Sequence, residues 1–241
     1  MVDSREVGYS AQEHTDLVGS ILAESVLKPH NIFRHVDVAG KRVIDIGCGD
    51  GAMSRKSVRK GASKVLGIDG KTDMIMIALK ENAGFEKHID YILSFIEDLK
   101  GNGSFDVAIL SYLLNNAKSF DQLASQCRVA AEFLKPGGVA VVYNNNPFDT
   151  VGGDFSKYGF RKNMTGLEPG SPIFYDYWPA ISDMIINYYF DSKSHEEVLS
   201  RAGFSEIEWK PLELYPGADA EFWHDYFDRD HLPVIGLVAR K

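Results

Sequence analysis

Three closely spaced glycines, Gly47, Gly49 and Gly51, follow the apolar run 43–46 and precede a helical pattern. Glycines at alternate positions let a ligand lie against the backbone where a side chain would clash, and the start of the next helix offers N–H groups to a ligand. A purely structural turn would need neither these glycines nor the acid Asp45 in the preceding run. The spacing therefore predicts a ligand-binding turn between a strand and a helix.

Two classes of ligand compete for such a turn. A dinucleotide site has the order Gly-x-Gly-x-x-Gly, which places a pyrophosphate at the helix N-terminus. Here the order is Gly47-x-Gly49-x-Gly51, and Ala52 stands where the last glycine of that order belongs. The carboxylate of Asp45 repels a pyrophosphate and suits a ligand that carries an ammonium group. NAD is therefore disfavoured.

The elements that must position this turn alternate between short β-rich runs and helical stretches. Alternation of this kind is typical of parallel strands joined by helical crossovers. We therefore predict an α/β fold, a doubly wound Rossmann-like sheet of about seven strands. The strands expected in its first half are 42–46, 64–68, 105–110 and 138–144, and the expected helices are 72–82 and 120–134.

The chain reads as a single domain, residues 1–241, in four parts. Residues 1–40 form a helical cap, in which Pro29 interrupts a helical pattern over 13–38. Residues 41–144 are the ligand-binding half, and residues 145–190 are a substrate-facing insertion. Within it, 145–178 has no regular pattern and reads as a lid or binding loop, before a strand over 184–190. Residues 191–241 close the fold. They are expected to form a helix over 194–202 that begins with a Ser194/Glu197 capping box. Strands over 205–214 and 234–239 follow, with a helix over 218–229 between them.

The composition narrows the class of partner. The chain has 241 residues, 26 Lys+Arg against 34 Asp+Glu, and a formal net charge of −8. This charge gives no reason to expect nucleic acid or an anionic membrane as a partner, and it favours a small-molecule substrate. The two cysteines, Cys48 and Cys127, are too few for a cysteine-based zinc site and read as free thiols, so we predict no metal and a cytoplasmic location. A homodimer is left open.

The run Asp45-Ile46-Gly47-Cys48-Gly49-Asp50-Gly51 resembles the first motif of the class I S-adenosylmethionine (SAM)-dependent methyltransferases. Asp69, which ends the run 65–69, matches the acid that binds the ribose hydroxyls of SAM in that family. The runs 105–114 and 134–138 resemble the fourth strand and the turn before the fifth. The resemblance covers 40–143 and implies SAM as the cofactor. The predicted cofactor site, drawn from this resemblance and from the chemistry of neighbouring residues, is Tyr9, Asp45, Gly47, Cys48, Gly49, Gly51, Asp69, Gly70, Phe95, Ile96 and Ser111.

Three of these residues carry specific expectations. Where the family often has an acid for the adenine amino group, this chain has Ser94-Phe95-Ile96, so adenine is expected to stack on Phe95 and to bond the N–H of Ile96. Tyr9, ahead of the first helix, is expected to fold over the cofactor.

Methyl transfer from SAM is an in-line attack, so the protein must mainly align two reactants, and a strong base is optional. Tyr112, directly after the fourth expected strand, is placed to present its ring to the sulfonium. The polar group Asn144 to Asn146 is expected to face the acceptor, together with Tyr175 of the insertion. His224 and Asp225 are the better candidates for a base. The predicted catalytic residues are therefore Tyr112, Asn144, Tyr175 and His224.

Short runs in the second half, Phe155-Ser156-Lys157-Tyr158-Gly159, Ala202-Gly203-Phe204-Ser205 and Phe222-Trp223, are similar to the group that contains the toxoflavin-pathway N-methyltransferase. This resemblance implies a heteroaromatic or amine-bearing metabolite of secondary metabolism as the acceptor. The leading prediction is SAM-dependent methyl transfer to N or O of a small metabolite. Two alternatives stay open. One is a cyclase that converts SAM itself to azetidine-2-carboxylate and methylthioadenosine. The other is a non-catalytic SAM-binding protein.

Overall fold

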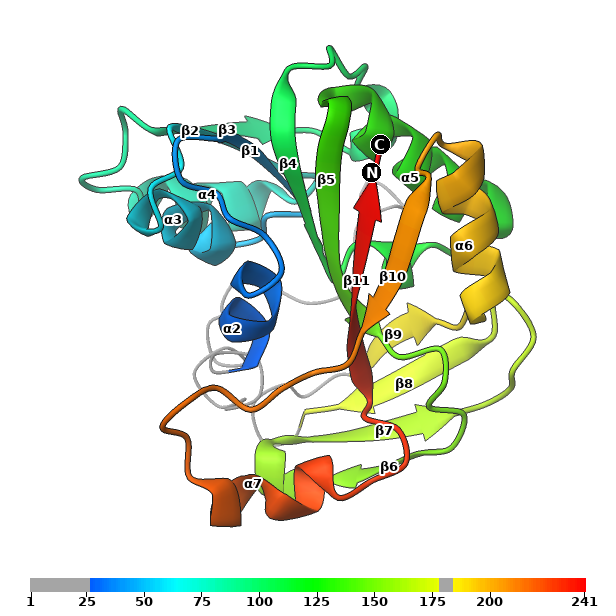
Figure 1. Ribbon diagram of the computed structural model, residues 1–241. Helices are drawn as coiled ribbons and strands as arrows, with labels where there is room; N and C mark the ends of the chain where they lie inside the picture. The colour runs from blue at the N-terminus through cyan, green and yellow to red at the C-terminus, as the bar shows by residue number, and fades with distance from the viewer. Residues whose placement is uncertain (1–26, 178–183) are drawn as a thin grey trace.

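The computed structural model describes residues 27–177 and 184–241. Its centre is a seven-stranded sheet in the order β10-β11-β5-β4-β1-β2-β3 (Figure 1). Strands β1 to β5 are mutually parallel, whereas β11 runs antiparallel to both of its neighbours. The strands are β1 (Arg42–Ile46), β2 (Lys64–Asp69), β3 (Ile89–Leu93), β4 (Phe105–Ser111), β5 (Leu134–Asn145), β10 (Glu206–Lys210) and β11 (Val234–Arg240). The predicted doubly wound α/β sheet is confirmed.

Helices cover both faces of this sheet, as the alternating side chains of its strands require. In β1, Ile44 and Ile46 point into one apolar core, which includes residues of α5 (Phe120–Phe133) and α6 (Ser192–Arg201). Val43 points into the other core, with residues of α2 (Lys28–Phe33) and α3 (Ala52–Arg59). The remaining helices are α4 (Thr72–Lys80), which packs on β2 and β3, and α7 (Ala220–Phe227). Because both faces are covered, the central strands are continuously apolar.

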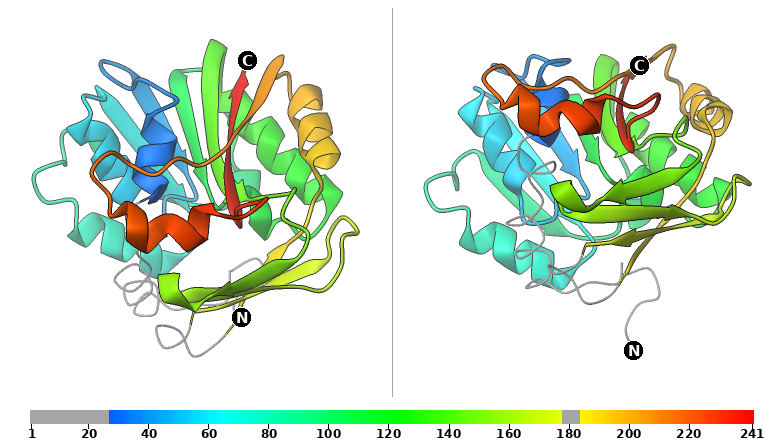
Figure 2. Two further views of the ribbon diagram at one scale, coloured as in Figure 1. Left: turned by 60° about the horizontal axis from the view of Figure 1, so that its bottom comes forward. Right: turned by 90° about the horizontal axis from the view of Figure 1, so that it is seen from below.

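The insertion folds as a second sheet, so the predicted lack of regular structure over 145–178 is wrong. Four antiparallel strands follow one another in the order β6-β7-β8-β9, and the sheet lies across the end of the main sheet to which β4 and β5 point (Figures 1 and 2). They are β6 (Gly152–Phe155), β7 (Phe160–Met164), β8 (Pro172–Asp176) and β9 (Ile185–Tyr188). Each strand has only four or five residues, and the glycines in the turns between them give the segment the composition of a loop. This is why no regular structure was predicted.

Two helix starts bear on the predictions from the sequence. Helix α6 begins at Ser192, and its N-cap is Asp191, whose carboxylate accepts the backbone N–H of Ser194 at 2.7 Å. The predicted capping box on Ser194 is therefore wrong, because an acid three residues earlier takes the same donor. Pro29 lies in the first turn of α2, where the missing N–H costs no hydrogen bond of this helix, and most of the pattern that it was predicted to interrupt lies outside the described residues. The rest of the expected helical cap lies outside the described residues.

Within the described residues, no helix is long and apolar enough to cross a membrane. Across 27–177 and 184–241, no group of three or more His, Cys, Asp and Glu side chains is arranged to hold a metal ion. Both cysteines are buried free thiols.

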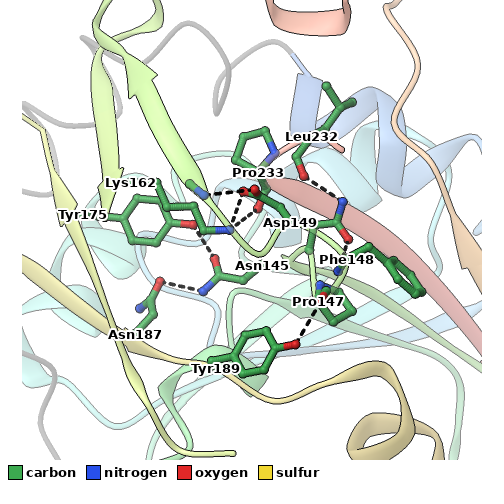
Figure 3. A network of polar contacts seen from close by, with 12 residues as sticks. Asn145, Pro147, Phe148, Asp149, Lys162, Tyr175, Asn187, Tyr189, Leu232 and Pro233 are labelled. Carbon is green, nitrogen blue, oxygen red and sulfur yellow. Dashed lines mark hydrogen bonds and ion pairs between the residues drawn. The ribbon is translucent and has the colours of Figure 1, made fainter. Parts of the chain in front are cut away.

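A polar network joins the second sheet to the end of the main sheet (Figure 3). The Tyr175 hydroxyl donates to Asn145 Oδ1 at 2.9 Å, and Asn145 Nδ2 donates to Asn187 Oδ1 at 3.3 Å. The Tyr189 hydroxyl donates to the backbone oxygen of Pro147 at 3.2 Å. These bonds tie β8 and β9 to the exit of β5, and they replace the water that these buried groups lose on folding.

An ion pair between Lys162 and Asp149 lies at the centre of this network. Lys162 Nζ is 2.8 Å from Asp149 Oδ2, and the two side chains are 0% and 3% exposed. The ammonium also donates to the backbone oxygen of Pro233 at 3.4 Å, and Asp149 Oδ1 accepts the N–H of Gly152 at 3.1 Å. Burial lowers the pKa of Lys162, whereas Asp149 opposes that shift. A charge this deep in the protein is tolerated only while its partner is present.

We predict that Lys162→Met, which leaves the Asp149 carboxylate buried without its cation, lowers the free energy of unfolding by about 3–5 kcal/mol. Urea denaturation at neutral pH measures this change. The double variant Lys162→Met/Asp149→Asn, in which neither charge is buried, should recover most of the loss.

The control is Lys157→Met, which breaks the exposed pair between Lys157 and Asp225, 2.9 Å apart. It should change stability little, because water screens exposed pairs. Equal effects of the two single variants would contradict the account.

Candidate functional site

The glycine turn connects β1 to α3 at the carboxyl edge of the main sheet. Gly47, Gly49 and Gly51 have φ angles of +71°, +53° and +78°, which L side chains rarely adopt. The N–H groups of Gly47 and Cys48 donate to the backbone oxygen of Ile68 at 2.8 and 2.9 Å, which fixes the start of the turn against β2. The turn is therefore a rigid backbone surface rather than a flexible loop.

Asp69, the last residue of β2, holds the middle of the turn. Its Oδ2 accepts the N–H of Gly49 at 2.8 Å, and its Oδ1 accepts the N–H of Lys71 at 2.9 Å. Hydrogen bonds to a carboxylate are stronger than those between neutral groups. A carboxylate has about four lone-pair sites, so Asp69 can fix the turn and accept ligand hydroxyls at the same time.

Tyr91 of β3 lies against the turn, although it was not among the predicted site residues. A Cβ added to Gly51 would clash with the Tyr91 hydroxyl, and one added to Gly67 would clash with its ring. Both glycines are thus required by the closeness of this tyrosine. Burial raises the pKa of Tyr91 to about 12, so its hydroxyl stays protonated. The β-branched and aromatic residues Ile89, Tyr91 and Ile92 are the signal that could have identified this strand and its tyrosine.

Asp45 is buried beneath the turn and is 1% exposed. Its Oδ2 accepts the hydroxyl of Ser54 in α3 at 2.6 Å. Burial raises the pKa of Asp45 to about 6, against the lowering effects of the Ser54 hydrogen bond and of the charge on Lys28. The Lys28 ammonium lies 5.9 Å from the centre of the Tyr112 ring, so α2 places a cation at the carboxyl edge of the main sheet. Sequence reasoning missed Lys28, since nothing local marks it.

The exits of β2 and β3 lie side by side. The N–H of Ser94 donates to the backbone oxygen of Asp69 at 2.9 Å. The Phe95 ring packs on Gly70 so closely that a Cβ at that position would overlap its ring carbons. Ile96 is buried at the start of a short 3₁₀ turn, Ile96–Asp98. The structure thus brings Asp69, Gly70, Phe95 and Ile96 together, as the cofactor prediction requires.

The exit of β4 carries two unusual features. Ser111 Oγ is buried without a hydrogen-bond partner among the described residues, which marks a place for a polar ligand atom. Tyr112 is the one non-glycine residue with positive φ, +55°, in the described parts of the chain. Its N–H donates to Tyr143 O at 2.8 Å and its carbonyl accepts Asn116 Nδ2 at 2.7 Å, so the surrounding bonds enforce this conformation. Strain held in this way is typical of functional sites.

Three further predicted residues, Cys48, Asn144 and Tyr175, are buried. Cys48 is buried in the turn, and burial, with the nearby Asp45 and Asp69, raises the pKa of its thiol well above the ordinary value. Asn144 Oδ1 accepts the N–H of Asn115 at 3.1 Å. Tyr175, in the second sheet, is 2% exposed and stacks on Tyr177 at 5.7 Å between ring centres.

His224 and Tyr9 are the two remaining predictions. The His224 side chain is 68% exposed on α7, where its Nδ1 lies 3.4 Å from Asp225 Oδ1. No contact among the described residues brings His224 to the edge that carries Tyr112. Tyr9 lies outside the described residues.

Known proteins match both the sequence and the fold. Residues 43–138 match the family model described as a methyltransferase domain. A ubiquinone biosynthesis O-methyltransferase of Xanthomonas oryzae pv. oryzae is 33% identical over 105 residues, which are 43% of this chain and 42% of that protein. The chain therefore matches less than half the length of that relative.

Among solved structures, an S-adenosylmethionine-dependent methyltransferase described as putative, from Listeria monocytogenes, has a TM-score of 0.65 at 21% identity and covers 89% of this chain and 98% of its own. The cyclase SpnF has a TM-score of 0.56 at 19% identity, with coverages of 98% and 84%. Residues 43–138 thus resemble a methyltransferase domain, and the chain shares the fold of solved S-adenosylmethionine-dependent methyltransferases. Because cyclases share this fold, the reaction must be argued from the site.

The buried acid predicts a pH effect on stability. Folding raises the pKa of Asp45 from 3.8 to about 6, so the folded state binds the proton more tightly than the unfolded chain. The contribution of Asp45 to stability is therefore complete at low pH and is lost as the pH rises to about 6, by about 3 kcal/mol in all. Asp45→Asn is neutral at every pH and avoids this loss. In urea melts, the stability of the wild type relative to this variant should fall between about pH 4 and pH 7; a constant difference would contradict the assignment.

Proposed function

We propose that this protein is an enzyme that binds SAM on the glycine turn and transfers its methyl group to nitrogen or oxygen of a small metabolite. The observation that carries the proposal is the Asp69 carboxylate, which holds the N–H of Gly49 and stands at the end of β2 beside the turn. A carboxylate there suits the two hydroxyls of a ribose. A chain with the fold of SAM-dependent methyltransferases and such an edge is expected to use SAM.

The other residues of the edge fit the remaining parts of SAM. The acid Asp45 under the turn suits an ammonium group, and it gives a pyrophosphate no favourable partner. The Phe95 ring, backed by Gly70, offers a flat apolar surface of the kind that a nucleobase stacks on. The unpartnered Ser111 Oγ offers a hydroxyl to a polar atom of the ligand.

SAM supplies a sulfonium methyl group that an acceptor displaces in line. The chain's task is to hold the acceptor on the far side of that methyl group and to exclude water. Tyr112 stands at the β4 exit with its backbone fixed, so its ring has a defined place beside the cofactor edge. An aromatic face near a cation contributes about 0.5–2 kcal/mol. No general base is required if the acceptor is an unprotonated amine.

The acceptor wall is assigned to the seam between the two sheets. There the Tyr175 hydroxyl and the Asn145 and Asn187 amides form one chain of hydrogen bonds (Figure 3). Because Asn145 uses its oxygen toward Tyr175 and its nitrogen toward Asn187, each amide is held in one orientation. Oriented amides recognise a molecule with fixed donors and acceptors, such as a heteroaromatic ring or a phenol. The similarity to the toxoflavin-pathway group favours nitrogen and secondary metabolism, whereas the curated relative is an O-methyltransferase.

The test is to incubate the purified protein with SAM, first alone and then with a panel of nitrogen heterocycles and phenols, and to identify the products by mass spectrometry. The proposal predicts that SAM persists alone, and that a methylated acceptor and S-adenosylhomocysteine form in equal amounts with the right acceptor. Methylthioadenosine and azetidine-2-carboxylate from SAM alone would establish the cyclase instead. SAM binding without turnover across the panel would favour a non-catalytic SAM-binding protein.

A second prediction concerns the turn. Asp69→Ala removes the acceptor for the Gly49 N–H and for the ribose, so calorimetry should show SAM affinity reduced about 100-fold or more. The matched control is Asp90→Ala, an exposed acid of the adjacent strand β3 that pairs with Lys64 at 3.0 Å. It should bind SAM like the wild type. Unchanged affinity in Asp69→Ala, with an unchanged circular dichroism spectrum, would place the cofactor elsewhere.

A further inference from the structure

A hollow of about 460 Å³ lies between α2, α3 and the loop that follows β10. We call it the α2–α3 groove. Its lining includes Tyr215, Pro29 and Pro216, the largely buried Phe33, and Lys56 and Lys60 on the α3 side. Its volume is in the range of sites that hold small organic molecules. Among the described residues, none that is assigned to the cofactor or to the acceptor lines it.

The two walls of the groove are fixed to each other. Asn31 of α2 is buried, and it donates Nδ2 to Glu213 O at 2.9 Å and accepts the Glu213 N–H on Oδ1 at 2.8 Å. Arg34 forms an ion pair with the Glu213 carboxylate and donates to Pro211 O at 3.3 Å. Figure 2 shows this loop passing over α2. The loop that carries Tyr215 is therefore held in place before any ligand arrives, which reduces the entropic cost of binding.

The charge of the groove is positive in a chain with a formal net charge of −8. Glu213 balances Arg34, but neither Lys56 nor Lys60 has a carboxylate within ion-pair distance in the described part of the chain. Lys60 Nζ lies 5.4 Å from the centre of the Phe33 ring, so a cation and an aromatic face meet at one place. An adjoining hollow contains the acid Asp37, whose Oδ1 accepts the N–H of Ala39 at 3.0 Å. Favourable charge at the C-terminal end of α3 explains two lysines, but not the aromatic lining or the fixed hollow.

The groove is separate from the glycine turn. Helix α3 begins immediately after Gly51, whereas Lys60 caps its other end. At about 1.5 Å per residue, these nine residues put the lysine about 13 Å from the turn. A ligand in the groove and one on the turn are thus at opposite ends of the same helix.

We propose that the α2–α3 groove binds a planar organic anion, an aromatic ring that carries a phosphate or carboxylate. The ring lies against Tyr215, and the anion meets Lys56 and Lys60, whose ammonium lies over the Phe33 ring. Because this inference uses no residue of the cofactor edge, it does not depend on the proposed methyl transfer.

Titration of the ¹⁵N-labelled protein with phenyl phosphate, followed by amide chemical shifts, tests the proposal. Shifts should concentrate on α2, on the second half of α3 and on 215–217, both without SAM and with SAM. Benzamide, a ring without the charge, and inorganic phosphate, a charge without the ring, should each bind at least tenfold more weakly than phenyl phosphate.

The variants locate the site. Lys60→Met and Tyr215→Ala should each weaken phenyl phosphate binding at least tenfold. Lys80→Met, which removes an exposed lysine from the last turn of α4, should leave binding unchanged. The proposal is overturned if inorganic phosphate binds as tightly as phenyl phosphate, if the two groove variants bind normally, or if SAM displaces the probe. Since none of these readouts involves turnover, failure here and failure of the methyltransferase proposal are distinguishable.

Discussion

The contact on which the functional edge depends is the hydrogen bond between the Asp69 carboxylate and the N–H of Gly49. It joins the end of β2 to the turn after β1, so that two strands that are neighbours in the sheet also share one polar group at their exits. The same carboxylate fixes the N–H of Lys71 just before α4. Glycines with positive φ have little intrinsic preference for one conformation, and this anchor selects it. A ligand that meets the turn finds a preformed surface.

Near this hydrogen bond, the carboxyl edge of the main sheet carries several energetically unfavourable groups that a purely structural region would lack. Asp45 is buried with a raised pKa, Ser111 Oγ has no partner, and the φ angle of Tyr112 is strained. In the rest of the sheet, the burial of two apolar cores and a regular strand register offset the free-energy cost of these groups. The second sheet covers the same edge, and its buried Lys162–Asp149 pair makes the position of that sheet depend on the loop after β5. The fold is therefore stabilised mainly by apolar burial, whereas the site is held by hydrogen bonds and ion pairs between oriented polar groups.

The first half of the fold could be predicted because its signals are local. Strand β1 was expected with the bounds that the structure has, and residue type and spacing predicted the turn. Asp69 and Phe95 were predicted by comparison with the motifs of the methyltransferase family. The second sheet could not be predicted in this way, since its strands are short and pair through aromatic residues such as Phe155 and Phe160, whose rings stack at 4.8 Å. Tyr91, Lys28 and Lys162 act through contacts with residues distant in the sequence, and no local pattern reveals such contacts. The site predictions for Tyr112, Asn144, Tyr175 and His224 stay predictions.

A crystal structure of the protein with SAM tests the central claim most directly. The account predicts the ribose hydroxyls within hydrogen-bond distance of Asp69, the amino acid portion along Gly47 to Gly51, and the adenine against Phe95, with the Gly49–Asp69 hydrogen bond intact. An adenosine bound away from the β2 exit, or an Asp69 carboxylate that leaves Gly49 to reach it, would contradict the account.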